Sequence, residues 1–480
     1  MEAQPMTKAT LTTLALAIGL FVSGCASLEP RLPEAATAIP ASLPSPSTTT
    51  TTTTAESSSA VPASATVGEV GWRDFFTDAR LNEVLAIALA NNRDLRVAVL
   101  NVEHARAQYR IQRAERLPAL GVNAQMERIG ADNPALESET YRASLGLSAF
   151  ELDLFGRVHN LGRSALQHYL ASESSQRSAQ LALIAEVANR WLSLGADREL
   201  LRIAEATLDS YEESLRLTER RQQLGATSEL VLYQTRAIVE SARSDVARFA
   251  GNVAQDINAL TLLVGHSVDA TLLPDTFEPQ ISGLGPLPAG LASDVLLRRP
   301  DVMAAEHELL AANANIGAAR AAFFPSISLT AGIGSISGEL SGLFESNSGF
   351  WNFVPQINIP VFQGGRLRAR LGMATADRDI ALAKYEKSIQ SGFREVADAL
   401  ALGQSLAAQR SAQTALLDAA QKAHDLSKAR YDAGLDSFLV LLDARRTLYA
   451  ARQSLLATQL AEQANRVTLY KALGGGWQQG

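Results

Sequence analysis

The chain has 480 residues, of which 47% are hydrophobic, 19% are charged and 6% are aromatic, and its formal net charge is −7. This acidic balance argues against nucleic acid as a partner, and the single cysteine excludes an intramolecular disulfide framework or a multi-cysteine metal site. The mean hydropathy of +0.01 is too low for a bundle of transmembrane helices, each of which requires about 20 apolar residues. Because much of the hydrophobic fraction is alanine, the composition favours long helices over a large mixed core.

The amino terminus has the pattern of an export signal. An apolar run over 11–22 has the length of a signal peptide and is too short for a membrane-spanning helix. Small residues follow, and then Cys25, the only cysteine of the chain. This arrangement resembles the lipobox of bacterial lipoproteins, which implies that residues 1–24 are removed and that Cys25 carries covalent lipid. The alternative is an ordinary signal peptide in which the cysteine is incidental.

The residues after Cys25 indicate where the lipidated chain goes and how it is attached. Ala26 and Ser27 stand where lipoproteins retained in the inner membrane commonly have Asp, so the resemblance implies a place in the outer membrane. Residues 25–70 are rich in Pro, Ser, Thr and Ala and include the homopolymer Thr48–Thr54. Such a composition has too few bulky apolar side chains to offset the entropy of ordering, and we expect a disordered tether.

The rest of the chain is a tandem duplication. The matched residues lie 207 to 209 positions apart and include Pro118 with Pro325, Gly225 with Gly434, and Arg236 with Arg445. The sequence therefore predicts two equivalent repeats, 71–273 and 291–474, joined by a Pro/Gly-rich linker at 274–290 and followed by a short tail at 475–480.

Each repeat predicts the same order of elements. A first helix ends before a proline, and two strands with apolar residues at alternate positions follow it. A helix of about 65 residues then ends at a glycine turn, which leads into a last helix. The expected first helices are 77–116 and 289–322, and the expected long helices are 157–224 and 366–433. The expected strands are 120–125, 141–154, 326–333 and 350–362.

Helices of this length do not fit a compact domain and must pack in an extended array. Four strands with one lipid-compatible face cannot close a membrane barrel, for which about eight strands are the minimum, and an open sheet would leave unpaired backbone groups in lipid. If the strands enter a membrane, several chains must therefore contribute to one barrel. The alternative from the pattern alone is a non-channel coiled-coil lipoprotein with small hairpins at one end.

Several segments resemble the TolC-like outer-membrane factor family, in its lipid-anchored multidrug-efflux (NodT/OprM-like) branch. They are Trp72–Phe76, Phe150–Arg157, Leu297–Asp301 and Ala433–Arg445. The resemblance covers 72–474 in order, duplication included.

This resemblance implies a mainly α fold with a membrane β-barrel part: a homotrimer with a twelve-stranded outer-membrane barrel continued by a long periplasmic α-helical barrel. The implied function is a passive exit duct of a tripartite efflux system. An inner-membrane transporter of the RND type would deliver drugs or other small solutes through a periplasmic adaptor (membrane fusion) protein. The alternative within the same family is the exit channel of a type I protein-secretion system.

The resemblance also assigns Leu439, Asp443 and Arg446 to the periplasmic aperture of the channel. Their spacings of four and three residues place them on one face of a helix. In the first repeat the counterparts of Asp443 and Arg446 are the uncharged Gln234 and Ala237, so the repeats differ in charge at this point. The alternative is an exposed ion pair of little energetic consequence.

The two glycine turns admit a structural and a functional interpretation. Glycine accommodates the left-handed conformation of a reversal, and a following Ser or Asp can cap the next helix. The resemblance implies in addition that the turns contact the adaptor. The residues concerned are Gly225, Thr227, Ser228, Gly434, Asp436 and Ser437.

The sequence contains no recognisable catalytic motif. The six histidines show no His-x-x-x-His spacing, and neither G-x-S-x-G nor a P-loop occurs. Gly332, Gly334 and Gly338 are spaced one residue too widely for a dinucleotide-binding fingerprint. We therefore expect no enzyme, no metal site and no cofactor other than the lipid.

Overall fold

The computed structural model describes residues 28–33, 35, 70–133, 137–277, 279 and 293–475. The predicted signal peptide, Cys25 and almost all of the predicted tether lie outside the described residues, as do most of the linker and the tail. The chain divides into two compact units. Unit 1 consists of Met1–Ala36, Leu100–Glu173 and Ala304–Lys387, and unit 2 consists of Thr37–Val99, Ser174–Met303 and Ser388–Gly480.

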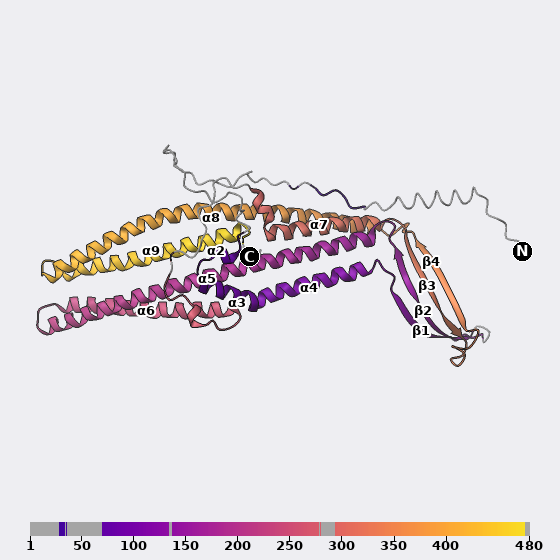
Figure 1. Ribbon diagram of the computed structural model, residues 1–480, viewed down its shortest axis with the longest axis horizontal. Helices are drawn as coiled ribbons and strands as arrows, with labels where there is room; N and C mark the ends of the chain where they lie inside the picture. Colours follow the sequence, from indigo (N-terminus) through magenta and orange to yellow (C-terminus); the bar gives the residue numbers. More distant parts are fainter. Residues whose placement is uncertain are drawn as a thin grey trace, which may run out of the picture. The chain divides into compact units, whose positions relative to one another are not determined.

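Unit 1 contains a four-stranded antiparallel sheet in the order β1-β2-β3-β4 (Figure 1). Its strands are β1 (Leu120–Ile129), β2 (Ser138–Leu152), β3 (Ser326–Ser337) and β4 (Gly349–Asn358). Both predicted hairpins are thus confirmed, with the return strands ending at Leu152 and Asn358 rather than at 154 and 362. Within the described residues, β1 and β4 each pair on one side only, so the sheet has two open edges.

The register gives the sheet one apolar face and one polar, glycine-rich face. Val122 pairs with Leu145, Leu145 with Ile333, and Ile333 with Trp351, so large apolar side chains align across all four strands. The opposite face carries Asn123 and Gly146. The apolar face is uncovered: Val122 is 80% exposed and Trp351 is 77% exposed. Its other exposed members are Leu120, Met126, Phe353 and Ile357.

A β-bulge in β2 maintains this separation of faces. The register with β3 shifts between Leu147 and Phe150. Ala149 takes a positive φ of 51°, and its N–H donates to Thr330 Oγ1 at 3.1 Å. The extra residue returns Phe150 and Leu152 to the apolar face, since alternate residues otherwise change sides. The alternation in the sequence predicted a regular strand here, and this irregularity was not foreseen.

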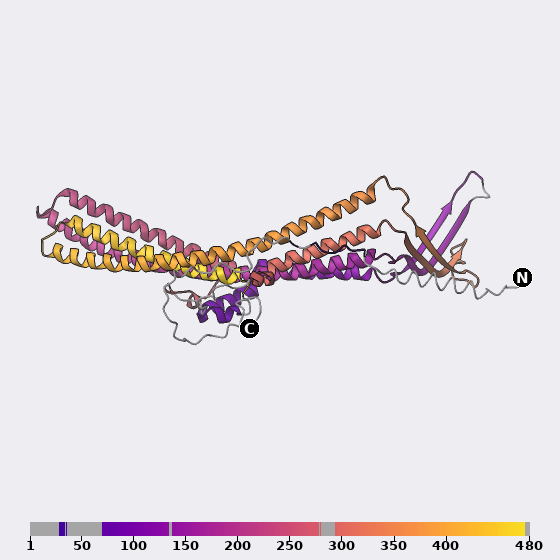
Figure 2. The ribbon, with the colours of Figure 1, turned by 90° about the horizontal axis from the view of Figure 1, so that it is seen from above.

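The long helices agree with the prediction. They are α5 (Arg157–Gln223) and α8 (Arg366–Asp432), each of 67 residues and hence about 100 Å long. Both begin in unit 1 and end in unit 2, where each is followed by an antiparallel partner, α6 (Glu229–Val264) or α9 (Phe438–Ala472) (Figure 2). No helix in the described part of the chain is both long enough and apolar enough to cross a membrane.

The first helix of each repeat differs from the prediction of one continuous helix. In the first repeat the structure has α2 (Trp72–Phe75), α3 (Ala79–Asn91) and α4 (Arg93–Ala114). The chain breaks at Asn92 because its side chain accepts from the N–H of Leu95 at 2.8 Å and donates to the carbonyl of Leu263 at 2.8 Å. The first of these bonds caps α4.

In the second repeat a 3₁₀ segment, η4 (Ser293–Arg298), precedes α7 (Pro300–Ala321). The helix predicted from 289 therefore begins at Pro300, which suits the first helical position because that position needs no N–H donor. A second 3₁₀ segment, η3 (Ala270–Leu272), follows α6 in the first repeat.

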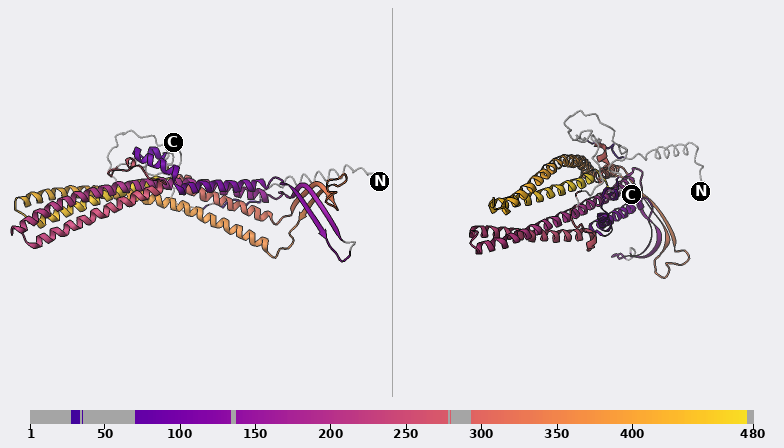
Figure 3. Two further views of the ribbon diagram at one scale, coloured as in Figure 1. Left: turned by 90° about the horizontal axis from the view of Figure 1, so that it is seen from below. Right: turned by 60° about the vertical axis from the view of Figure 1, so that its left-hand side comes forward.

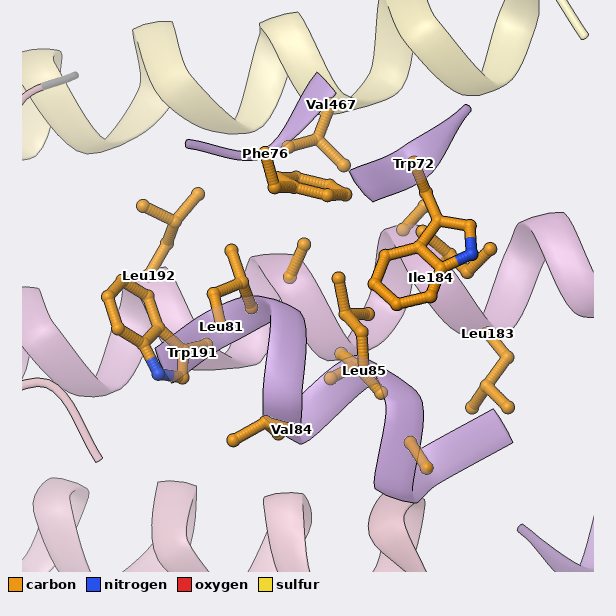
Figure 4. Packing of buried hydrophobic residues seen from close by; sticks show 14 of the residues in the cluster. Trp72, Phe76, Leu81, Val84, Leu85, Leu183, Ile184, Trp191, Leu192 and Val467 are labelled. Carbon is orange, nitrogen blue, oxygen red and sulfur yellow. The ribbon is translucent and has the colours of Figure 1, made fainter. Parts of the chain in front are cut away.

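The main core of unit 2 forms around the short helices α2 and α3 (Figure 4). Trp72 from α2, Phe76 directly after it and Leu85 from α3 pack with Trp191 from α5. Phe75 stacks on Tyr470 of α9 with ring centroids 3.9 Å apart. The aromatic motif at 72–76 thus joins the start of the body to the helices of both repeats.

Candidate functional site

The α5/α6 and α8/α9 hairpins of unit 2 end in two matched turns (Figure 3). Gly225 and Gly434 take φ values of +70° and +73°, the left-handed conformation that glycine adopts without strain. Leu435 N–H donates to the carbonyl of Arg430 at 2.9 Å, and the equivalent bond in the first repeat is 2.8 Å long. Both turns therefore have the same helix C-cap geometry, as the duplication predicts.

The two turns differ in how the following helix is capped. Ser228 caps α6, because its Oγ accepts from the N–H of Val231 at 3.4 Å. Ser437 occupies the N-cap position of α9 but makes no side-chain cap bond. The carboxylate of Asp436 instead binds the Arg430 guanidinium at 2.7 and 2.9 Å. The predicted capping of α9 by Ser or Asp is therefore wrong, since Ser437 makes no cap bond and the Asp436 carboxylate is engaged by Arg430.

Electrostatics and exposure at the turns suit a contact surface. The Arg430 hydrogen bonds hold the pKa of Asp436 below its usual range, so this carboxyl is ionised at neutral pH. Thr227 is half-buried in the first turn. Large apolar side chains that were not predicted from the sequence are exposed at both turns. Leu224 is 83% exposed, Leu230 is 66% exposed and Leu435 is 68% exposed.

The predicted aperture residues share the outward face of α9. Leu439 is 62% exposed, and Asp443 and Arg446 are also exposed, whereas Leu441 and Leu442 are buried on the packed side. Among the described residues, neither the Asp443 carboxylate nor the Arg446 guanidinium has a hydrogen-bond or ion-pair partner. The ion pair considered as the alternative is therefore not formed within the chain, and both charges are available to a neighbouring molecule.

Contacts between the hairpins hold α9 in this orientation. Arg445 Nη1 donates to Ser214 Oγ of α5 at 2.7 Å. The Tyr449 hydroxyl donates to Asp245 Oδ2 of α6 at 3.1 Å. Burial, together with the adjacent Asp245 carboxylate, raises the pKa of Tyr449, so the hydroxyl remains a donor.

A third contact between the hairpins lies close to the turns. Arg221 Nη1 of α5 donates to the hydroxyl of Tyr431 in α8 at 2.7 Å. None of these contacts was predicted from the sequence. The matched arginines gave no signal in the sequence, since Arg236, the counterpart of Arg445, binds Glu219 of its own hairpin at 3.0 Å instead.

The described residues contain no group of three His, Cys, Asp or Glu side chains that could hold a metal ion. The features brought together at this end of unit 2 are two exposed apolar turns and one charged helix face. Such a surface can bind a protein partner or line a polar opening.

Comparisons with known proteins assign this arrangement to a family. The family described as "Outer membrane efflux protein" matches residues 84–266 and 291–475, one match for each repeat. A relative in Pseudomonas putida, "Probable efflux pump outer membrane protein TtgC", is 45% identical over 98% of this chain and 96% of its own length.

Solved structures of membrane proteins are similar to this chain as well. A membrane protein from Pseudomonas aeruginosa has a TM-score of 0.84 at 40% identity, covering 94% of this chain and 98% of that one. The open state of the MtrE outer membrane channel from Neisseria gonorrhoeae has a TM-score of 0.83 at 38% identity, covering 94% and 99%. This chain belongs to the outer membrane efflux protein family.

Proposed function

We propose that three copies of this chain form the outer-membrane exit duct of a tripartite efflux system. An inner-membrane pump of the RND type delivers drugs or other small solutes through a periplasmic adaptor protein, and the duct itself is passive. The chain needs neither a catalytic site nor a cofactor for this role. Lipid on Cys25 anchors each copy in the outer membrane, because each buried CH₂ of the acyl chains contributes about 0.8 kcal/mol.

The sheet is the observation that carries this proposal. Its two open edges, β1 and β4, leave backbone groups unpaired, and its apolar face is uncovered. In a bilayer both features are compatible only with a closed barrel. Three sheets joined edge to edge, β4 of one copy beside β1 of the next, give twelve strands, a number within the range of known membrane barrels. The apolar face then meets lipid and the glycine-rich face lines the pore.

The charged face of α9 supports a gate. With three copies around one axis, Asp443 forms a ring of three carboxylates, and Arg446 lies within one helical turn of each. Such a ring attracts cations and controls ion passage at a constriction. The equivalent face of α6 carries Gln234 and Ala237, so only alternate hairpins contribute charge.

The turns support an adaptor contact. Leu224, Leu230 and Leu435 are exposed at the ends of the two hairpins, and exposed apolar side chains gathered at one place favour a protein interface. Asp436 and Thr227 add polar groups to the same surface.

Purification of the chain from outer membranes tests this function. We expect trimers that dissociate only on heating and that conduct ions in planar lipid bilayers. A monomer without conductance would refute the proposal. For the adaptor, a Leu435→Cys variant should cross-link to a periplasmic protein encoded with the pump, whereas Leu340→Cys, at an exposed site in the β3–β4 loop, should not.

A further inference from the structure

The described start of the chain, Leu28–Pro33, lies on unit 1 against α5 and α7 (Figure 1). The Glu29 side chain is only 10% exposed. One of its oxygens pairs with Arg163 of α5, and the other accepts from Asn313 Nδ2 of α7 at 3.0 Å. The segment therefore bridges two helices that are far apart in the sequence.

The backbone of the segment is bound as well. Asn313 Nδ2 donates to the carbonyl of Pro30 at 2.9 Å, and Arg320 Nη1 donates to the carbonyl of Leu28 at 3.1 Å. Asn313 is 1% exposed, and the two hydrogen bonds of its amide nitrogen both go to this segment. A buried amide nitrogen is unfavourable without partners, and the segment supplies both of those that Asn313 Nδ2 has, so this contact is specific.

We propose that this surface of α5 and α7 is the docking site of the mature amino terminus and that it sets the depth of the lipid anchor relative to the sheet. The inference rests on the proposed lipidation of Cys25. Two residues, Ala26 and Ser27, lie between Cys25 and Leu28, so three residue steps can carry the lipid at most about 11 Å from the docked segment.

The position of this surface along α7 determines where the lipid is held. Arg320, which binds Leu28, is the penultimate residue of α7, and β3 begins at Ser326. The acyl chains are thus held beside the junction of helix and strand, so that lipid and strands enter the same bilayer together. Glu29 acts as a positioning residue that couples anchoring to insertion of the sheet.

Trypsin provides a direct test on the intact lipidated protein in detergent. Arg31 is exposed and is the only Lys or Arg between Cys25 and Arg73, so cleavage there releases one amino-terminal peptide. A protease cuts such a segment in its undocked state, and the rate reports the undocked fraction. We expect Glu29→Arg, which creates no new tryptic site because Pro30 follows, to raise the rate roughly tenfold.

Rescue separates docking from a general loss of structure. The double variant Glu29→Arg/Arg163→Glu restores the opposite charges, and we expect both slow cleavage and the wild-type yield of heat-dissociable trimer. Glu103→Arg is the matched control. It makes the same charge change on α4 of unit 1, where Glu103 pairs with Arg106 of its own helix at 3.5 Å and, within the described residues, is not bonded to the docked segment. It should leave cleavage at Arg31 unchanged.

The rate of release and the mass of the released peptide test the docking of the segment and the lipidation of Cys25 separately. An acylated peptide released equally fast from the wild type and Glu29→Arg would overturn the docking site alone. A peptide without acyl chains on Cys25 would overturn the lipid assignment, and the inference about depth with it.

Discussion

Arg299 shows what a single buried charge contributes to this fold. It is 5% exposed and joins three elements of unit 2: Nη1 donates to the carbonyl of Ala472 at 2.7 Å, and Nη2 binds both Asp301 and Glu395 at 2.8 Å. It therefore ties the start of α7 to α8 and to the end of α9. The Leu297–Asp301 motif, noted in the sequence only as a family resemblance, has this structural basis.

Replacing this arginine should destabilise the protein. We expect Arg299→Met to cost about 2–3 kcal/mol, less than a fully buried pair would, because the partner carboxylates are partly solvated. Thermal unfolding of the trimer, followed by circular dichroism, measures the change. The adjacent and exposed Arg298 gives the control Arg298→Met, and equal melting temperatures for the two variants would contradict the assigned role.

Asp256 of α6 gives a pH-dependent prediction. It is 8% exposed, with Arg190 Nη1 at 4.0 Å. Burial, and then the nearby Asp197 carboxylate, raise its pKa from 3.8 to about 6. The folded state thus binds this proton more tightly than the unfolded chain does, so the group destabilises the fold as pH rises from about 4 to about 6.

Asp256→Asn should remove this loss of stability at higher pH. At pH 7.5 we expect the variant to be more stable than the wild type, by at most about 3 kcal/mol, and at pH 4 the difference should vanish. Melting temperatures at the two pH values measure this. Asp209→Asn, at an exposed position of α5, is the control. A gain from Asp256→Asn that is the same at both pH values would argue against the assignment.

At the scale of elements, the bulge in β2 is the feature most easily tested. Deleting Ala149 removes the extra residue and moves either Phe150 and Leu152 or the preceding apolar residues to the polar face. We expect the deletion to abolish heat-dissociable trimers in outer-membrane fractions. Ala149→Gly, which tolerates the positive φ, should assemble normally. Normal assembly of the deletion variant would show that the face assignment is wrong.

The elements that the sequence predicted are those governed by local pattern. Alternating apolar residues indicated all four strands, and glycine turns at Gly225 and Gly434 marked the ends of the long helices. At the break at Asn92 one bond is local, the cap that Leu95 N–H makes with the Asn92 side chain, but the other goes to the carbonyl of Leu263, 171 residues away, which no local pattern indicates. The start of α7 at Pro300 carried a local signal, since proline favours the first helical position.

The same distinction applies to the candidate site. Spacing alone predicted that Leu439, Asp443 and Arg446 share a helix face. It could not predict that Asp436 binds Arg430 in place of capping α9, because two local partners compete for one carboxylate. Nor could it predict the bond between Tyr449 and Asp245, which lie 204 residues apart in different hairpins.

At the scale of the whole molecule, the duplication explains both the likeness and the difference of the halves. Each repeat supplies one strand pair, one helix of 67 residues and one hairpin turn, so the scaffold is made twice. The repeats differ in the helices that begin each of them, and within the hairpins they differ in charge and contacts. Gln234 is the counterpart of Asp443, and Arg445 reaches the other hairpin whereas Arg236 does not. This asymmetry is what a channel needs if only one of its two hairpins controls the opening.

Single-channel conductance of reconstituted trimers tests the gate most directly. We predict a small conductance for the wild type and a several-fold larger one for Asp443→Ala. In the proposed trimer the variant shortens the side chain at the constriction and removes the carboxylates that can pair with Arg446, so the closed opening becomes wider. Gln234→Ala shortens the counterpart of Asp443 in the first repeat to alanine, and this variant should conduct like the wild type. Equal conductance of Asp443→Ala and the wild type would contradict the assignment of the gate to this face of α9.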